Sequence, residues 1–221
     1  MATALKDLPP YAEEKQESNQ TGRPLKRLFT LEEFAEIVRA LPDDRLELIK
    51  GEIVMSPPPD DPHIEQTMGI EYWLQKHLNE IEKLGCRVMG SSAWYAAPKE
   101  LKQKWVDEGG NGPDHVLPDA SVPYADYLRT NRRPPALLVI EVISVSSKSA
   151  IDRDLVTKPE IYATLEIPAY WVIDRRDKCV WVHTAPENGQ YASRIQYKGQ
   201  QRLPAPGMEF LNITPAQIFG D

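Results

Sequence analysis

The stretch Ala136-Leu-Leu-Val-Ile-Glu-Val-Ile143 is the most apolar run of the sequence, and only Glu141 interrupts it. Its length and its aliphatic content predict a buried strand. Because side chains alternate across a strand, Leu137, Val139 and Glu141 share one face. A buried carboxylate is costly unless a cation or a metal compensates it. Glu141 is therefore either part of a polar site or a strand-end residue that pairs with an arginine.

Elements of both kinds surround this strand. The other expected strands are 87–95, a short one directly after Pro118-Asp119, 169–174 and an outer hairpin of 178–183 with 191–197. The expected helices are 64–84, one within 151–165, and 214–219. Because strands and helices alternate, we expect an α/β (α+β) fold with a mixed central β-sheet flanked by helices.

The N-terminal part predicts an added helix and hairpin. Thr30-Leu-Glu-Glu33 has the pattern of a capping box, and the apolar spacing after it predicts a helix up to residue 40. Residues 45–49 and 52–55 read as a hairpin with a Lys50-Gly51 turn. Residues 1–24 are polar and lack periodicity, so we expect a disordered or loosely packed leader before one domain at 25–221.

Composition excludes several classes of protein. The 221-residue chain has 26 Lys and Arg against 33 Asp and Glu, a net charge of −7, which excludes a strongly basic coat but allows a local basic patch. Cys86 and Cys179 fit neither a disulfide framework nor a zinc ribbon. No apolar run approaches the roughly 18 residues of a membrane span, and the N-terminus lacks a signal-peptide core, so we expect a cytoplasmic protein.

Asp119 is the natural companion of Glu141. It follows Pro118 and precedes a short apolar stretch, about a score of residues before Glu141. Two neighbouring strands would aim both carboxylates at one point. Two carboxylates and a backbone carbonyl suit a hard cation such as Mg²⁺. Without Glu141, Asp119 would be interpreted as a turn residue.

Lys158 is the third candidate, one helical turn after Asp154 and one turn before Tyr162. A lysine there could lean over the two carboxylates and orient water or stabilise developing negative charge. The alternative is a solvated helix lysine paired with Asp154.

His63 and Glu47 are secondary candidates. His63 opens the helix expected at 64–84, where it could instead interact only with the helix cap. Glu47 alternates with apolar neighbours in the hairpin and could instead face solvent, and Glu52 competes with it. The basic candidates for contact with a polyanion are Lys99, Lys102, Lys104, Arg129, Arg132 and Arg133, whose alternative is a solvated loop.

Six segments in this order carry a resemblance to a known family. They are Leu46-Glu-Leu-Ile-Lys-Gly-Glu-Ile-Val-Met-Ser-Pro57, His63, Pro118-Asp119, Val139-Ile-Glu-Val-Ile-Ser144, Asp154-x-x-x-Lys158-x-x-x-Tyr162 and Ile167-Pro-Ala-Tyr-Trp-Val-Ile-Asp174. Over residues 28–219 the chain resembles the bacterial restriction endonuclease family with the PD-(D/E)xK nuclease-like fold. The resemblance implies a core of one helix, three antiparallel strands, a second helix and a further strand.

The same resemblance implies the roles of the site residues. Asp119 and Glu141 would bind a divalent metal, Mg²⁺ or Mn²⁺ in its place, with the Val142 carbonyl completing the site. In this fold the lysine usually stands two residues after the acidic residue, where this chain has Ile143, and the family moves it to the next helix, where Lys158 matches.

Pro159 departs from what the next helix requires. An interior proline removes a helix hydrogen bond and disfavours helical geometry at the residue before it. We therefore expect Lys158 at a kink or at a helix start.

These residues support three hypotheses. The first is a metal-dependent endonuclease that hydrolyses phosphodiester bonds of DNA, with a homodimer left open. The second is a catalytically inactive binding or assembly module that keeps the nuclease fold. The third, a hydrolase of small phosphoesters, would be favoured by a closed pocket without a basic rim.

Overall fold

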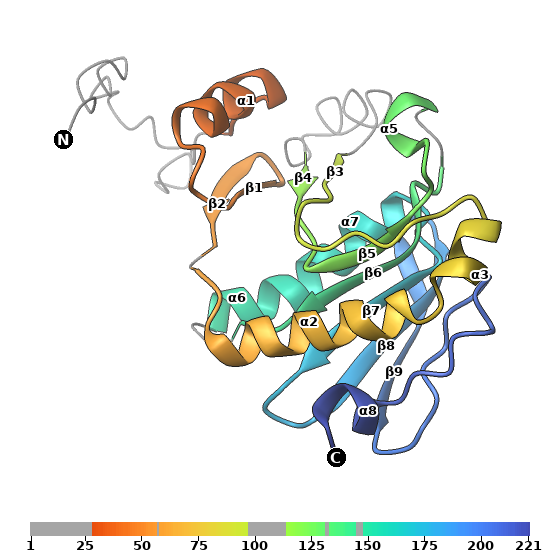
Figure 1. The fold of residues 1–221 in the computed structure, drawn as a ribbon. Coiled ribbons are helices and arrows are strands. Elements are labelled where there is room, and N and C mark those ends of the chain that lie inside the picture. Colours follow the sequence, from red (N-terminus) through yellow and green to blue (C-terminus); the bar gives the residue numbers. More distant parts are fainter. Residues whose placement is uncertain (1–27, 57, 97–113, 131–132, 145–147) are drawn as a thin grey trace.

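Two sheets and their helices make up the computed structural model (Figure 1). It describes residues 28–56, 58–96, 114–130, 133–144 and 148–221. The expected leader at 1–24 lies outside these residues, so the domain boundary stays a prediction. No helix of the described ranges is both long and apolar enough to cross a membrane.

The described helical segments are α1 Leu31–Ala40, α2 Asp61–Gln75, α3 Leu78–Lys83, α5 Tyr127–Thr130, α6 Lys148–Asp152, the π-helical segment η1 Arg153–Thr157, α7 Lys158–Thr164 and α8 Pro215–Phe219. The described strands are β1 Leu46–Ile49, β2 Glu52–Met55, β3 Tyr95–Ala96, β4 His115–Val116, β5 Ala120–Pro123, β6 Ala136–Val142, β7 Ala169–Asp174, β8 Cys179–Glu187 and β9 Gln190–Lys198.

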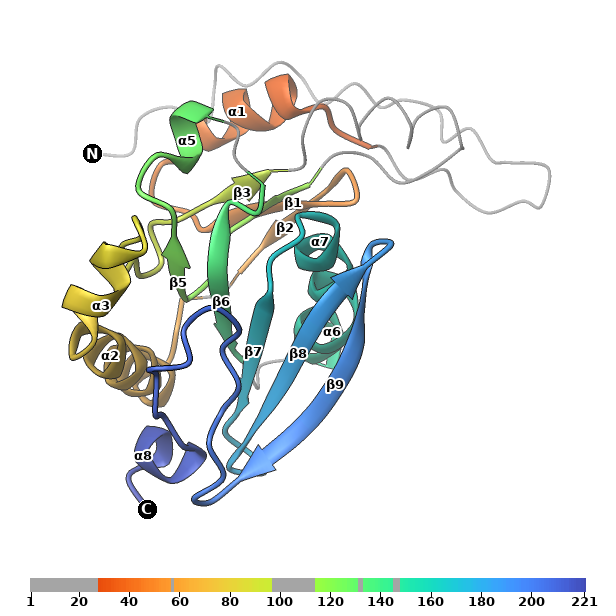
Figure 2. The same ribbon diagram turned by 90° about the vertical axis from the view of Figure 1, so that its right-hand side faces the viewer.

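The larger sheet has the strand order β5-β6-β7-β8-β9. Its strands are antiparallel except β6 and β7, which run parallel and are joined by the helical stretch α6–η1–α7. Figure 2 shows this stretch on one face of the sheet and α2, α3 and α8 on the other. Apolar side chains fill both interfaces. The expected mixed sheet flanked by helices is therefore confirmed.

The smaller sheet, β2-β1-β4-β3, carries the N-terminal helix and hairpin. Lys50 and Gly51 between β1 and β2 both have positive φ, 52° and 80°, as the tight hairpin turn requires. Helix α1 begins at the predicted Thr30–Glu33 capping box. Its Phe34 packs against β1, so this helix covers the sheet. The added helix and hairpin are as predicted.

The strand expected at 87–95 is mostly absent, and only β3 forms at its end. Cys86 and Met89 meet the edge of β5 only through isolated bridges, in one register. Pro123 lies between the two bridges and accepts the Arg87 N–H but has no N–H to donate in return, and the chain then turns, with the Ala93 N–H bonded to the Gly90 carbonyl. One of the three antiparallel strands that the resemblance implies is thus reduced to two bridges.

The helix expected at 64–84 is also interrupted. It starts earlier, at Asp61, and breaks at Lys76–His77 into α2 and α3. The His77 N–H bonds to the Leu74 carbonyl three residues back, which is the tighter geometry of a 3₁₀ turn. Gly85, with φ 73°, follows the end of α3 as predicted.

Candidate active site

The sequence candidates meet in a pocket of about 160 Å³. Its walls come from β1 and the residue before it, the segment between β2 and α2 with the start of α2, the residue before β5, and the end of β6 with the helical stretch that follows. Its lining residues are Arg45, Glu47, Ser56, Pro58, Pro59, Asp60, His63, Asp119, Glu141, Val142, Ser144, Arg153, Asp154 and Lys158.

Glu141 and Lys158 form a buried, directly hydrogen-bonded pair at the centre of this group. The Lys158 Nζ lies 2.7 Å from the Glu141 Oε1, and both side chains are 4% exposed. The Tyr162 hydroxyl donates a second hydrogen bond, 2.8 Å long, to the same oxygen. The partner of Glu141 is therefore a lysine on the next helix and not an arginine.

Two further carboxylates share Lys158. Its Nζ lies 3.0 Å from the Glu47 Oε1 and 3.6 Å from the Asp154 Oδ1. Glu47 is only 1% exposed and also accepts a hydrogen bond from the Leu117 N–H, so the interpretation that it faces solvent is wrong. The alternative pairing of Lys158 with Asp154 exists, but the lysine is buried and not solvated.

Asp119 is held by a separate set of donors. Its Oδ1 lies 3.1 Å from an Arg45 Nη and 3.2 Å from the His63 Nε2, and its Oδ2 accepts the Val142 N–H. The backbone N–H of His63 donates to the Asp60 side chain, as in a helix cap. His63 therefore takes part in the cap through its backbone and contacts Asp119 through its ring. Val142, whose carbonyl was the expected third ligand, lines the pocket.

Burial and crowding set the protonation of these groups. Burial raises the pKa of Glu141 to about 8, although Lys158 opposes the shift. Burial likewise raises the pKa of Asp154 to about 6 against the same lysine. Burial opposes the charge of Lys158, but the surrounding carboxylates more than offset it and raise its pKa. Lys158 is thus protonated, and the surrounding carboxylates share its one positive charge.

Asp119 has the opposite tendency. Burial alone would raise its pKa, but the hydrogen bond from His63 and the charge of Arg45 outweigh burial and hold the pKa below its ordinary value. The pocket therefore contains one carboxylate that is firmly ionised and a second, Glu141, that takes up a proton near neutral pH. The charge on Glu141 increases when another cation is added.

A π-helical segment resolves the departure at Pro159. In η1 the Lys158 N–H bonds to the Arg153 carbonyl five residues back. In the same register Pro159, which has no N–H, leaves the Asp154 carbonyl unpaired. The Tyr170 hydroxyl donates to that carbonyl at 2.8 Å. Lys158 is thus the first residue of α7, in agreement with the predicted kink or helix start. Its side chain points toward Glu141.

The donor set of the pocket is suited to a divalent cation. Four buried carboxylates, those of Glu47, Asp119, Glu141 and Asp154, line it. The Lys and Arg side chains that line it are Arg45, Arg153 and Lys158. Four carboxyl groups face these three cations, so an excess of negative charge appears when Glu141 loses its proton, and carboxylate oxygens are the ligands that Mg²⁺ prefers.

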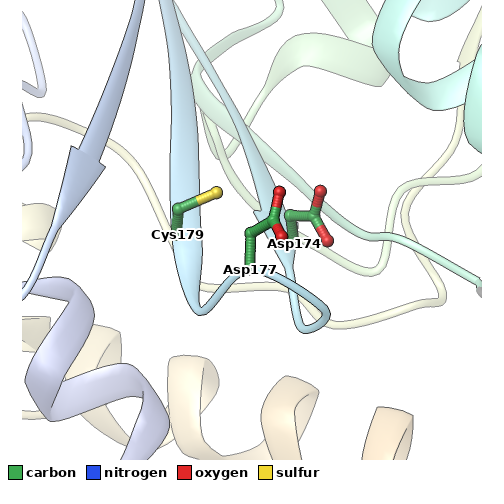
Figure 3. A group of neighbouring side chains, drawn as sticks. All are labelled: Asp174, Asp177 and Cys179. Carbon is green, nitrogen blue, oxygen red and sulfur yellow. The ribbon is translucent and has the colours of Figure 1, made fainter.

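A second group of ligand atoms lies elsewhere in the described part of the chain. Asp174, Asp177 and Cys179 place one ligand atom each within 4.8 Å of one another at the turn between β7 and β8 (Figure 3). Arg176, however, already binds both oxygens of Asp174, and the Cys179 Sγ accepts from Gln196. The ligand atoms of Asp174 and Cys179 are thus already used in local hydrogen bonds that stabilise the ends of the two strands.

Sequence reasoning gave no site role to Arg45 and Arg153, which line the pocket, or to Tyr162, which binds Glu141. Arg45 contacts Asp119, and its signal was the i, i+2 spacing to Glu47, which puts both on one strand face. Tyr162 follows Lys158 by one helical turn and reaches Glu141. Of the six basic candidates, only Arg129 and Arg133 lie within the described residues, and neither lines the pocket.

Comparisons with known proteins agree with this architecture. No curated protein matches the chain. Among solved structures, it is similar to the crystal structure of "a putative nuclease belonging to DUF820" from Anabaena variabilis ATCC 29413, with 16% sequence identity and a TM-score of 0.62. That match covers 87% of this chain and 98% of the other, and it shows a common fold. A family model, Uma2, matches residues 31–215, so the chain belongs to the family described as "Putative restriction endonuclease".

Proposed function

We propose that this protein is a metal-dependent endonuclease that hydrolyses phosphodiester bonds of DNA. The single observation that carries the proposal is the meeting of Asp119, Glu141 and Lys158, from two strands and a helix, at the pocket. Membership of a family of restriction endonuclease type supports the choice of nucleic acid as substrate.

Asp119 and Glu141 would hold Mg²⁺, or Mn²⁺ in its place, and the Val142 carbonyl would complete the set. A bound divalent ion polarises the scissile phosphate and lowers the pKa of a bound water. Glu141 needs such an ion to stay ionised at neutral pH, because burial raises its pKa to about 8. The excess of buried carboxylates over Lys and Arg supports the same assignment.

Lys158 would act on the substrate as a cation. Its raised pKa keeps Nζ protonated, so it stabilises negative charge on the phosphate or donates a hydrogen bond to water, and does not accept a proton. Glu47 would hold the lysine in place through its 3.0 Å contact. His63 would keep Asp119 ionised through its 3.2 Å contact.

The size of the pocket supports a polymeric substrate. Pockets that enclose small ligands usually have volumes of about 300–1,000 Å³. The present pocket of about 160 Å³ accommodates an ion and a phosphate group but not a whole nucleotide. A phosphodiester backbone lying across its mouth therefore fits better than a small phosphoester enclosed within it. A homodimer stays a prediction.

The test is cleavage of supercoiled plasmid and of single-stranded DNA in Mg²⁺ or Mn²⁺. Wild type is compared with Asp119→Asn and Lys158→Met, all purified identically. Asp177→Asn is the matched control, because Asp177 belongs to the other group of ligand atoms. We expect cleavage by wild type and Asp177→Asn, none by Asp119→Asn, and strongly slowed cleavage by Lys158→Met.

Cleavage that persists unchanged in Asp119→Asn would reject the assigned site. DNA binding without cleavage by wild type in either metal would favour the inactive binding module instead.

A further inference from the structure

Arg153 differs from the other basic side chains of the pocket in having no acceptor. Arg45 contacts Asp119, and Lys158 contacts Glu141 at 2.7 Å. Arg153 lines the same pocket, yet within the described residues its guanidinium makes no hydrogen bond or ion pair. Its Nε is buried and has no partner.

The backbone fixes where this side chain lies. Arg153 is the first residue of η1, and its carbonyl accepts the Lys158 N–H. The Oδ1 of the residue after it, Asp154, lies 3.6 Å from the Lys158 Nζ, and against burial the nearby charge of Arg153 only lowers the pKa of Asp154, without a direct ion pair. The Arg153 side chain lines the pocket, and its Nε donor remains without an acceptor.

A buried N–H donor without an acceptor is unfavourable, so the site is complete only when an acceptor arrives. Nε and a terminal nitrogen of arginine form a planar fork that matches two oxygens of a phosphate.

We infer that Arg153 binds the non-bridging oxygens of a substrate phosphate and so positions the nucleic-acid backbone across the pocket. The inference rests on the proposed function for the identity of the substrate. It adds a substrate contact outside the set of Asp119, Glu141 and Lys158.

Binding is measured by fluorescence anisotropy of a labelled DNA duplex in Ca²⁺ at several salt concentrations, with the duplex shown to be intact afterwards. The proteins are wild type, Arg153→Gln, Arg153→Lys and the control Arg39→Gln. Arg39 is an exposed residue of α1 whose Nε donates to the Ala35 carbonyl of its own helix. Equal thermal unfolding midpoints check that the variants fold.

Arg153→Gln should weaken binding at least tenfold and make the slope of log K against log salt shallower by about 0.9, the value for one lost phosphate contact. Arg153→Lys should keep the slope and bind more weakly than wild type, because lysine keeps the charge but not the fork. If Arg153→Gln does not fold, the comparison of Arg153→Lys with wild type decides. Arg39→Gln should match wild type.

A dissociation constant within twofold of wild type and an unchanged slope in Arg153→Gln, or wild-type affinity in Arg153→Lys when only that variant folds, would overturn the inference. So would a wild-type protein that does not bind DNA. Cleavage in Mg²⁺ is scored separately, so a protein that binds through Arg153 without cutting would refute the nuclease and keep this contact.

Discussion

Replacing Glu141 by glutamine should stabilise the metal-free protein at neutral pH. The folded carboxyl has its pKa raised from 4.5 to about 8 by burial, so between these values the folded state binds a proton that the unfolded state has lost. Stability therefore falls as pH rises from 4.5 to 8 and then levels off. Glutamine does not titrate and lacks this slope.

The size of the effect follows from the shift. At pH 7 the folded carboxyl is still protonated, although this pH lies 2.5 units above the ordinary pKa of 4.5 at which the unfolded carboxyl ionises. At roughly 1.4 kcal/mol per unit this corresponds to about 3 kcal/mol. Glu141→Gln should exceed wild type in unfolding free energy by about that amount at pH 7, and by little near pH 5.

Urea unfolding in EDTA, followed by tryptophan fluorescence from pH 5 to 8.5, measures the difference. Glu160→Gln on α7 is the matched control, because the Glu160 side chain is 47% exposed. Added Mg²⁺ should stabilise wild type by mass action and leave Glu141→Gln nearly unchanged. A variant less stable than wild type at pH 8 in EDTA, or a difference independent of pH, would refute the reasoning.

Three further substitutions test the surroundings. Lys158→Met should destabilise the metal-free protein by about 3–5 kcal/mol in urea unfolding, because it removes the cation from a buried carboxylate group; a loss below 1 kcal/mol would contradict this. Tyr170→Phe should cost about 1–3 kcal/mol by the same method, because it leaves the Asp154 carbonyl without a donor; an unchanged midpoint would show that water replaces the hydroxyl. His63→Ala should slow Mg²⁺-dependent cleavage at least tenfold with an unchanged circular dichroism spectrum, because Asp119 loses its contact to the imidazole; wild-type rates would mean that Arg45 alone suffices.

Most of the fold could be predicted from local sequence patterns. The apolar run around Glu141 is strand β6, and the capping box at Thr30 begins α1. The sequence could not reveal the break at Lys76–His77, because the apolar spacing continues through it. It also overestimated the strand at 87–95, where Pro123 of the neighbouring strand, far along the chain, interrupts the pairing.

The charged residues of the candidate site could be predicted because Glu141 lies in an apolar run, where a buried carboxylate needs a cation or a metal as partner. Glu47 remained ambiguous because alternation in a hairpin does not say which face is covered. The aim of Lys158 depends on the π-helical turn and on the Tyr170 hydroxyl, a contact between residues far apart in sequence. The low helix propensity of Pro159 by itself predicted only a disrupted helix.

Metal binding at Asp119 and Glu141 is the central claim, and Mn²⁺ binding detected by electron paramagnetic resonance tests it most directly. Titrations use wild type, Asp119→Asn and the control Asp177→Asn. The account predicts Mn²⁺ binding by wild type that is lost in Asp119→Asn and kept in Asp177→Asn. Binding that survives in Asp119→Asn and disappears in Asp177→Asn would contradict it and would place the metal at the turn between β7 and β8.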